Sequence, residues 1–306
     1  IIIVDDGSTD RTAEIAHGYE GITYIRQDNA GPAAARNRGA AAAKGEWLAF
    51  TDSDCIAEPD WISALMAKVR ANEGKGVVGV GGTYGIANPE SLLARIIHAE
   101  IQARHARMKD EVDFLGSFNV AYERKAFEAV GGFDESFSQA SAEDNDLAYR
   151  LIDAGGKLLF SKLAVVNHYH PTRLLPYFKT QMRHGFWRVR LYQKHPEWQK
   201  GDSYAGKGEL ASSGVLLGFG GGLIIITLTT LWLGKEVDWG LVFGMLTGLL
   251  LLSFFQMAGI ALRIHRYVDG TGALLYPVIG VSRDFPRAAG LAWGTLHFYL
   301  LRKTIV

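Results

Sequence analysis

The stretch Ile1-Ile2-Ile3-Val4-Asp5-Asp6-Gly7-Ser8 decides how the N-terminal half of the chain is read. Four aliphatic residues that end in two carboxylates and a glycine predict a buried parallel strand running into a turn. A second apolar run, Trp47 to Thr51, ends in the same way at Asp52-Ser53-Asp54. In open parallel sheets, ligands bind beyond the carboxyl ends of the strands. We therefore expect the two acidic turns to meet at one edge of a sheet.

The composition excludes several classes of protein. The chain has 306 residues, with 32 Lys plus Arg and 32 Asp plus Glu, so its formal net charge is zero and no nucleic-acid partner is expected. Hydrophobic residues make up 48% of the chain, which excludes an intrinsically disordered protein. The single cysteine, Cys55, allows neither an internal disulfide nor a cysteine-based zinc cluster. Strands that alternate with helices predict an α/β fold with a mostly parallel sheet.

The carboxylates of Asp52 and Asp54 are separated by one residue at a strand end, so both can turn toward one hard cation. Mg²⁺ and Mn²⁺ prefer oxygen ligands and share them with substrate diphosphates. A solvated turn is the ordinary alternative, because Asp and Ser favour turns. The acidic turn at residues 5–8 can accept hydrogen bonds from a nucleobase or a ribose, or can simply cap the following helix.

Several short motifs resemble the inverting family 2 glycosyltransferases of the GT-A fold, and they stand in the order of that family. The resemblance covers about residues 1 to 190 and implies a Rossmann-like catalytic domain that moves a sugar from a nucleotide diphosphate donor with inversion of the anomeric centre. The motifs are Val4 to Asp10, Gly31 to Gly39, Phe50 to Asp54, Gly116 to Tyr122, Gly131 to Glu135 and Glu143 to Arg150.

The resemblance assigns roles to the residues that match the family's motifs. A general base must accept the proton of the attacking hydroxyl, and the family's base matches Asp144, next to Glu143. An acidic helix start is the alternative for this pair. The residues expected at the nucleotide are Asp5, Asp6 (favoured over Asp5), Gly7, Ser8, Arg36 and Asp52. The metal, Mg²⁺ or Mn²⁺, is expected at Asp54 and Asp52, with His168 as a further ligand or an ordinary loop histidine.

The segment Gln181 to Trp187 loosely matches a Gln-x-x-Arg-Trp motif of processive relatives, in which these residues hold the diphosphate and the acceptor. Arg183 and Trp187 stand at other spacings here, which weakens the processive interpretation. A basic amphipathic helix at a membrane surface is the alternative for this segment, and both roles can hold together.

The C-terminal third reads as membrane. Residues 210–233 and 239–262 are each 24 residues long without a charge, enough at about 1.5 Å per residue to cross a bilayer. The segments on the two outer sides of this pair of spans are basic. By the positive-inside tendency, we expect both segments, and with them the catalytic domain, to be cytoplasmic. Residues 270–301 are apolar but interrupted by charges and Pro286, and predict interfacial or re-entrant helices or one poorly formed span.

These interpretations give an expected domain order of a GT-A domain at 1–195, a linker at 196–209 and a multi-pass membrane region at 210–306. We also expect an N-terminal strand and helix to precede residue 1. The expected function is inverting transfer from a nucleotide sugar, by default a UDP-sugar, to a lipid-linked or other glycan acceptor at the cell membrane, as in exopolysaccharide or cell-envelope glycan synthesis. The alternatives are a processive polysaccharide synthase and a non-catalytic membrane scaffold of the same fold.

Overall fold

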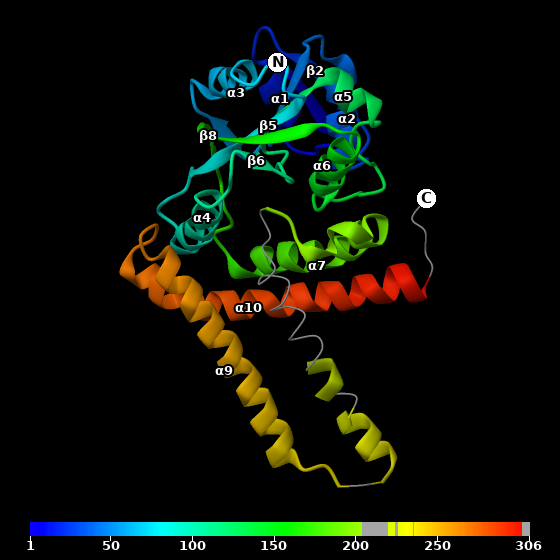
Figure 1. The fold of residues 1–306 in the computed structure, drawn as a ribbon, viewed down its shortest axis with the longest axis vertical. Coiled ribbons are helices and arrows are strands. Elements are labelled where there is room, and N and C mark those ends of the chain that lie inside the picture. The colour runs from blue at the N-terminus through cyan, green and yellow to red at the C-terminus, as the bar shows by residue number, and fades with distance from the viewer. Residues whose placement is uncertain (204–219, 224–225, 235, 302–306) are drawn as a thin grey trace. The chain divides into compact units, whose positions relative to one another are not determined.

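The computed structural model describes residues 1–203, 220–223, 226–234 and 236–301, drawn as ribbon in Figure 1. The chain divides into two compact units. The first comprises residues 1–85 and 108–168, and the second lies within residues 86–107 and 169–303. The expected domain boundary at residue 195 stays a prediction, although the units show that two helices before it, at 92–105 and 174–194, cluster with the C-terminal helices.

The first unit holds the strands and five of the helices described here. The strands are β1 Ile2–Asp6, β2 Thr23–Gln27, β3 Trp47–Thr51, β4 Cys55–Ala57, β5 Val77–Ile86, β6 Glu111–Val112, β7 Asn119–Glu123 and β8 Lys157–His168; their helices are α1 Thr12–His17, α2 Pro32–Ala42, α3 Trp61–Arg70, α5 Arg124–Ala129 and α6 Glu143–Asp153. The expected α/β class is confirmed, with the alternation of strands and helices clear in the first half of the unit.

The expectation of a mostly parallel sheet is wrong. β1 and β2 are parallel and form a two-stranded sheet, but β7 runs antiparallel to both β3 and β5, and β4 and β6 run antiparallel to β8. The partners in these pairs, such as β3 and β7, are far apart in the chain, so the local alternation of strands and helices does not set their relative direction. The sheet of β3, β7, β5, β8, β4 and β6 is therefore mixed.

One apolar cluster fixes α3 on the sheet. Trp61 and Leu65 of α3 pack with Val80, Ala121 and Val166 from three different strands, and all five side chains are buried. The indole N–H of Trp61 donates to Asn119 Oδ1, so even the polar end of this side chain is satisfied inside the core. The cluster thus joins α3 to β5, β7 and β8.

A buried asparagine explains why glycines follow one another in β5. Asn119 Nδ2 donates to the carbonyl oxygens of Thr83 and Ala164, and so connects β7 to its neighbour β5 and to β8 beyond it. A Cβ atom at Gly82 would lie 2.2 Å from Ala164 O and 2.4 Å from Asn119 Nδ2. The glycines of this stretch, for which the sequence indicated no role, leave room for the packing of the sheet.

The second unit is helical. Its elements are α4 Leu92–His105, α7 Leu174–Lys194, the 3₁₀ turn η1 Pro196–Lys200, α9 Trp239–Ile264, α10 Gly270–Thr295 and the π-helical turn η2 Leu296–Leu300. Residues 270–301 were expected to form short interfacial or re-entrant helices, but α10 is one helix of 26 residues with Pro277 and Pro286 inside it. Packing against α7 and α9 outweighs the local helix-breaking tendency of proline.

Among the residues that the structure describes, one helix is long and apolar enough to cross a membrane. This helix is α9, and only 11% of its most apolar stretch is buried. The expected first span at 210–233 lies in part outside the described residues, where only 220–223 and 226–234 are described and 220–223 and 226–232 are helical. The expected linker at 196–209 likewise lies partly outside, beyond residue 203.

Candidate active site

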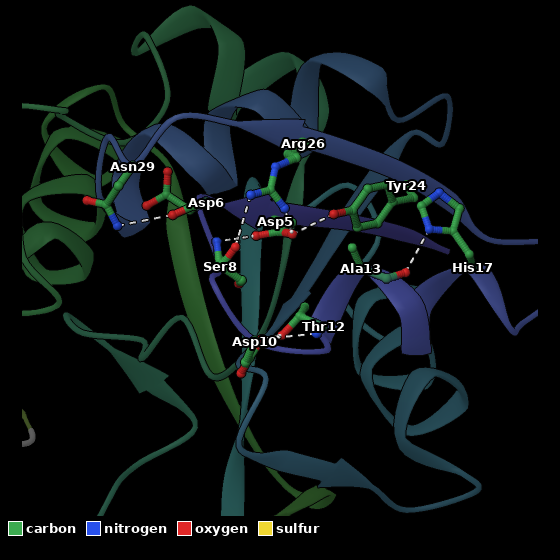
Figure 2. A network of polar contacts seen from close by, with 10 residues as sticks. All are labelled: Asp5, Asp6, Ser8, Asp10, Thr12, Ala13, His17, Tyr24, Arg26 and Asn29. Carbon is green, nitrogen blue, oxygen red and sulfur yellow. Dashed lines mark hydrogen bonds and ion pairs between the residues drawn. The ribbon is translucent and has the colours of Figure 1, made fainter.

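The first acidic turn is built around the buried carboxylate of Asp5 (Figure 2). Its Oδ2 accepts hydrogen bonds from the hydroxyl of Tyr24 at 2.5 Å and from Arg26 Nη1 at 3.0 Å, and its Oδ1 accepts the backbone N–H of Ser8 at 2.7 Å. The Tyr24 hydroxyl first, then the Ser8 hydrogen bonds and the charge of Arg26, lower the pKa of Asp5 to about 2. Asp5 is therefore an anion that shapes the turn.

Asp6 closes the loop after β2. Its carboxylate accepts the backbone N–H groups of Ala30 and Gly31, at 2.8 and 2.9 Å, and the side-chain amide of Gln27 at 2.8 Å. Gly7 turns the chain with a φ of +82°, and a Cβ there would lie 2.9 Å from the backbone nitrogen of Asn29, so only glycine fits. Asp6 is half-buried, so of the two carboxylates it is the one that a ligand can reach.

Arg36 of α2 connects the second acidic turn with the predicted catalytic pair. Its Nη2 donates to Asp52 Oδ1 and its Nη1 donates to Glu143 Oε1, both at 2.8 Å, and its guanidinium lies over the ring of Phe133 at 5.5 Å. Burial disfavours the charged guanidinium, but the carboxylates of Asp52 and Glu143 outweigh it and raise the pKa of Arg36. The structure thus brings three sequence-predicted site residues into direct contact.

The two residues of the predicted catalytic pair differ in their surroundings. Glu143 is 2% exposed, and its second oxygen, Oε2, accepts the backbone N–H of Ser141 at 2.6 Å. Asp144 is half-buried, and its Oδ1 accepts the N–H of Asn145 at 2.9 Å. Both lie in the first turn of α6, directly after Ala142, whose φ of 72° is the one positive value at a non-glycine among the described residues. That backbone costs energy and is found where surrounding contacts demand it.

The carboxylate of Asp54 lies beside His168. His168 Nε2 is 3.2 Å from Asp54 Oδ2, because β4 pairs with β8 in a register that sets Cys55 opposite His168. Donor atoms of Asp54, Cys55 and His168 all lie within 4.8 Å of one another. Burial works against the charge of Asp54, but the hydrogen bond and charge of His168 prevail and lower its pKa. Burial first, then the charge of Asp54, raise the pKa of Cys55 to about 12.

Asp52 and Asp54, which were both expected at the metal, have different partners in the structure. Asp54 pairs with His168, as a shared metal site requires, whereas Asp52 pairs with Arg36. The thiol of Cys55 stays protonated, which agrees with its interpretation as a packed side chain rather than a nucleophile. His168 is further held by the ring of Tyr84, whose centroid lies 4.9 Å from its own.

The residues predicted to contact the acceptor lie in the second unit, on α7. Gln181 is buried and accepts a hydrogen bond from Arg287 of α10. Trp187 is 2% exposed and packs on Phe186 and Phe298. Arg183 is half-buried and its Nε has no hydrogen-bond partner. Gln181 and Trp187 therefore have structural partners of their own, and the acceptor role of all three residues stays a prediction.

Three residues that support these groups were not predicted as site residues: Tyr24, Arg26 and Asn37. Tyr24 and Arg26 hold Asp5, but only the parallel register of β1 and β2, which sets Asp5 opposite Arg26, reveals this. The side-chain oxygen of Asn37 accepts a hydrogen bond from the backbone N–H of Phe133, and its amide nitrogen donates to the carbonyl oxygen of Phe133. These two hydrogen bonds anchor the Gly131–Glu135 motif beside α2. The available signal was the position of Asn37, directly after Arg36 and within the Gly31–Gly39 motif.

Comparison with known proteins identifies the first unit. Residues 1–131 match the family model described as glycosyl transferase family 2. These residues belong to glycosyl transferase family 2. The family 2 region carries β1 to β7 and both acidic turns, so the resemblance expected from the motifs is confirmed.

Two curated relatives illustrate what the chain is similar to. It is 30% identical over 207 residues to a pre-mycofactocin glycosyltransferase of Mycobacterium tuberculosis, a match that covers 64% of this chain and 43% of that protein. It is 32% identical over 184 residues to the validoxylamine A glucosyltransferase of Streptomyces hygroscopicus, covering 49% of this chain and 43% of the relative. The chain thus spans less than half the length of these relatives.

A solved structure shares the fold over nearly the whole chain. This is a mannosyltransferase from Pyrobaculum calidifontis in complex with GDP-Man and Mn²⁺, with a TM-score of 0.54. The match covers 97% of this chain and 77% of that one at 17% sequence identity. At this identity the likeness establishes the GT-A-like fold and nothing about substrates.

Proposed function

We propose that the chain is an inverting glycosyltransferase that moves a sugar from a nucleotide diphosphate donor to an acceptor delivered at a membrane. One observation carries the proposal. Arg36 donates to Asp52 of the second acidic turn and to Glu143, the neighbour of Asp144, and this bridge supports a shared site at the strand ends where ligands bind. The family 2 identity of residues 1–131 supports sugar transfer as the chemistry.

The first acidic turn is the proposed nucleoside site. Asp5 is buried and accepts three hydrogen bonds from the chain, so it acts as a support for the turn that Gly7 and Ser8 complete. Asp6 is the more accessible carboxylate, and each carboxylate oxygen can accept more than one hydrogen bond. We therefore assign contact with a nucleobase or ribose hydroxyl to Asp6. A UDP-sugar is the proposed donor.

Asp144 is the proposed general base. Its neighbour Glu143 accepts from Arg36 and from the backbone of Ser141, so its lone pairs are largely occupied and it serves to position the turn. Asp144 is half-buried, less so than Glu143, and lies in the first turn of α6, where the helix dipole favours the ionised form. An ionised carboxylate within hydrogen-bond reach of the acceptor hydroxyl can take its proton as the bond to the anomeric carbon forms.

Asp54 and His168 fit a divalent cation. The carboxylate oxygen and the imidazole nitrogen are 3.2 Å apart, a spacing at which both can ligate one ion. A metal held there supplies positive charge against the diphosphate that departs with the nucleotide. A nitrogen ligand suits Mn²⁺ better than Mg²⁺, which prefers oxygen. Cys55 is not proposed as a ligand, because Mg²⁺ and Mn²⁺ prefer oxygen ligands to the softer thiolate. Whether Asp52 joins the site depends on its release from Arg36.

The membrane part of the proposal rests on α9. This helix has 26 residues, is uncharged from Trp239 to Leu262 and exposes most of its apolar side chains. Hydrocarbon is the solvent that such a surface requires. We therefore propose a membrane-bound protein whose acceptor is lipid-linked, with a role in exopolysaccharide or cell-envelope glycan synthesis.

The test measures nucleotide release by the full chain in lipid nanodiscs. UDP- and GDP-sugars are screened with Mn²⁺, with Mg²⁺ and with EDTA, in the presence of extracted membrane lipids as acceptors. We expect metal-dependent release of one nucleotide, abolished in Asp144→Asn and Asp54→Asn but unchanged in the control Glu20→Gln, an exposed acid outside the site. Full activity of either site variant would disprove its assigned role, and binding of a nucleotide without any turnover would favour a non-catalytic scaffold.

A further inference from the structure

Helix α10 has its charged residues on the inside. Of its 26 residues only Arg283, Asp284 and Arg287 are charged. Arg283 is 2% exposed and Asp284 is fully buried, and Arg287 is half-buried with its Nη2 donating to Gln181. A helix on the surface of a water-soluble protein shows the opposite arrangement, with charges outward and the apolar stripe inward.

The outer face of α10 is a continuous apolar stripe. Its exposed large side chains recur at helical spacing, and three of them lie between 39% and 78% exposed within the first half of the helix. No charged residue interrupts the stripe. The apolar residues of this face, including its continuation into η2, are Leu274, Leu275, Val278, Phe285, Ala289, Ala292, Trp293, Leu296, Tyr299 and Leu300.

The inner face of α10 packs against α4, α7 and α9. Gly290 and Gly294 allow α7 to approach closely, since a Cβ at Gly290 would lie 1.9 Å from the carbonyl oxygen of Met182. Near the start of α10, Tyr276 is buried in an apolar cluster with residues of α4 and α9. Arg283 donates two hydrogen bonds to Glu100 of α4, at 2.7 and 2.5 Å. The three charged residues of the helix thus contact protein, and the apolar stripe remains to be covered.

The stripe is continuous with the proposed membrane helix. The last turns of α9 pack on α10 through Met257, Ala261 and Ile264, whereas the first half of α9 is almost entirely exposed. Figure 1 shows the two helices leaving their shared link in different directions. The link itself carries the exposed polar residues His265, Arg266 and Asp269, which belong at the level of lipid headgroups.

We propose that α10 lies in the surface layer of the bilayer, with its apolar stripe among the acyl chains and its charged side held by α4 and α7. If α9 crosses the membrane, a helix that packs on its end in another direction runs along the membrane plane. The 26 residues of α10 provide roughly 39 Å of such a contact. Trp293 and Tyr299 are side chains that favour the interface between acyl chains and headgroups. This inference rests on the membrane part of the proposed function and not on sugar transfer.

Spin labels test the proposal in the full chain in nanodiscs of phosphatidylcholine and phosphatidylglycerol. In a Cys55→Ser background, single cysteines are introduced by Val278→Cys, Phe285→Cys and Ala289→Cys on the stripe. Phe243→Cys on exposed α9 is the reference for lipid, and Leu163→Cys, 76% exposed on β8, is the reference for water. Collision with apolar O₂ and with the water-soluble nickel complex NiEDDA is measured at each site.

The proposal predicts that the ratio of O₂ to NiEDDA collisions at the three stripe positions shifts away from the value at Leu163→Cys and toward the value at Phe243→Cys. Values equal to those at Leu163→Cys, with Phe243→Cys still lipid-like, would overturn the inference and leave the membrane helix intact. Protection from both reagents would overturn it in favour of a second copy of the chain on the stripe. A water-like Phe243→Cys would overturn both the inference and the membrane part of the proposed function. Nucleotide release by the same labelled proteins reports separately whether sugar transfer fails.

Discussion

Arg36 and Glu143 are 107 residues apart in the chain, yet Nη1 of the arginine lies 2.8 Å from Oε1 of the glutamate. The same guanidinium reaches Asp52 at 2.8 Å, so one side chain of α2 joins a strand end and a helix start. Because Glu143 is buried, Arg36 is the counter-charge that offsets the energetic cost of burying its carboxylate. The ion pair therefore links the stability of the first unit to the geometry of its candidate catalytic residues.

Replacing Arg36 is expected to lower the stability of the protein. Arg36→Met leaves Glu143 buried without a counter-charge, for which we expect a loss of about 3 kcal/mol in the free energy of unfolding. The matched control is Arg11→Met, because Arg11 pairs with Glu14 on the surface with side chains 76% and 66% exposed, and such pairs contribute about 1 kcal/mol or less. Thermal unfolding of the full chain compares the two variants. An equal shift in both would show that Glu143 does not depend on Arg36.

The hydrogen bond from Tyr24 to Asp5 is expected to make stability depend on pH. The pKa of Asp5 is lowered to about 2 from an ordinary 3.8, so the stabilisation is fully present above that ordinary value and is lost as the pH falls through about 2. Tyr24→Phe removes the largest cause of the shift and brings the pKa of folded Asp5 back toward 3.8. The stability difference between wild type and Tyr24→Phe should therefore be greatest at neutral pH and shrink below about pH 4.

Denaturant titrations of both proteins between neutral and acid pH measure this difference. Tyr19→Phe is the control, since Tyr19 is 64% exposed and lies outside the network of Figure 2. A difference that stays constant down to the acid limit would mean that Tyr24 stabilises by packing alone, and the ionisation of Asp5 would then have no part in it.

Much of the candidate site could be predicted because its chemistry is local in sequence. Asp52 and Asp54 follow directly after a strand, and the strand itself was plain from five residues, Trp47 to Thr51. The meeting of Asp54 and His168 followed from a motif resemblance, and the pairing of Cys55 with His168 in neighbouring strands provides the physical reason. The contacts of Arg36 with two carboxylates depend on tertiary packing, and no spacing in the sequence reports them.

The errors in the fold have equally local causes. β4 has three residues and β6 has two, too few for a hydrophobic period to appear, so the antiparallel partners of β8 were missed and the sheet was expected to be mostly parallel. Pro286 and the charges at Arg283 and Asp284 broke the apolar pattern of 270–301. In the structure these charges are the buried face of one helix, which a rule for water-soluble helices does not anticipate.

Helices α7 and α10 lie so close together at Gly290 that we expect no side chain to fit there. A Cβ there would meet the backbone of α7, with Met182 O at 1.9 Å and Phe186 N at 2.9 Å, and backbone atoms cannot move aside as a flexible side chain does. We expect Gly290→Ala to destabilise the protein by about 1–3 kcal/mol through overpacking. Gly259→Ala in α9, where a Cβ has nothing within 4 Å, is the control and should be neutral or slightly stabilising. Thermal unfolding in nanodiscs measures both, and equal midpoints would rule out the close helix contact.

The pair of Glu100 and Arg283 is expected to show strong energetic coupling. Arg283 is 2% exposed and its Nη1 donates to both carboxylate oxygens of Glu100. Removing one of the two leaves the other charge without this partner, although Arg104 still contacts Glu100 and Asp284 still contacts Arg283. We expect Glu100→Gln and Arg283→Met each to cost about 3 kcal/mol or more, and the double variant to cost clearly less than their sum. The exposed pair of Arg95 and Asp269, with side chains 34% and 47% exposed, is the matched control and should give nearly additive effects. Unfolding of the four proteins of each cycle in nanodiscs measures the coupling. Additivity in both cycles would mean that the charged side of α10 is held by apolar packing alone, and its inward orientation would then need another explanation.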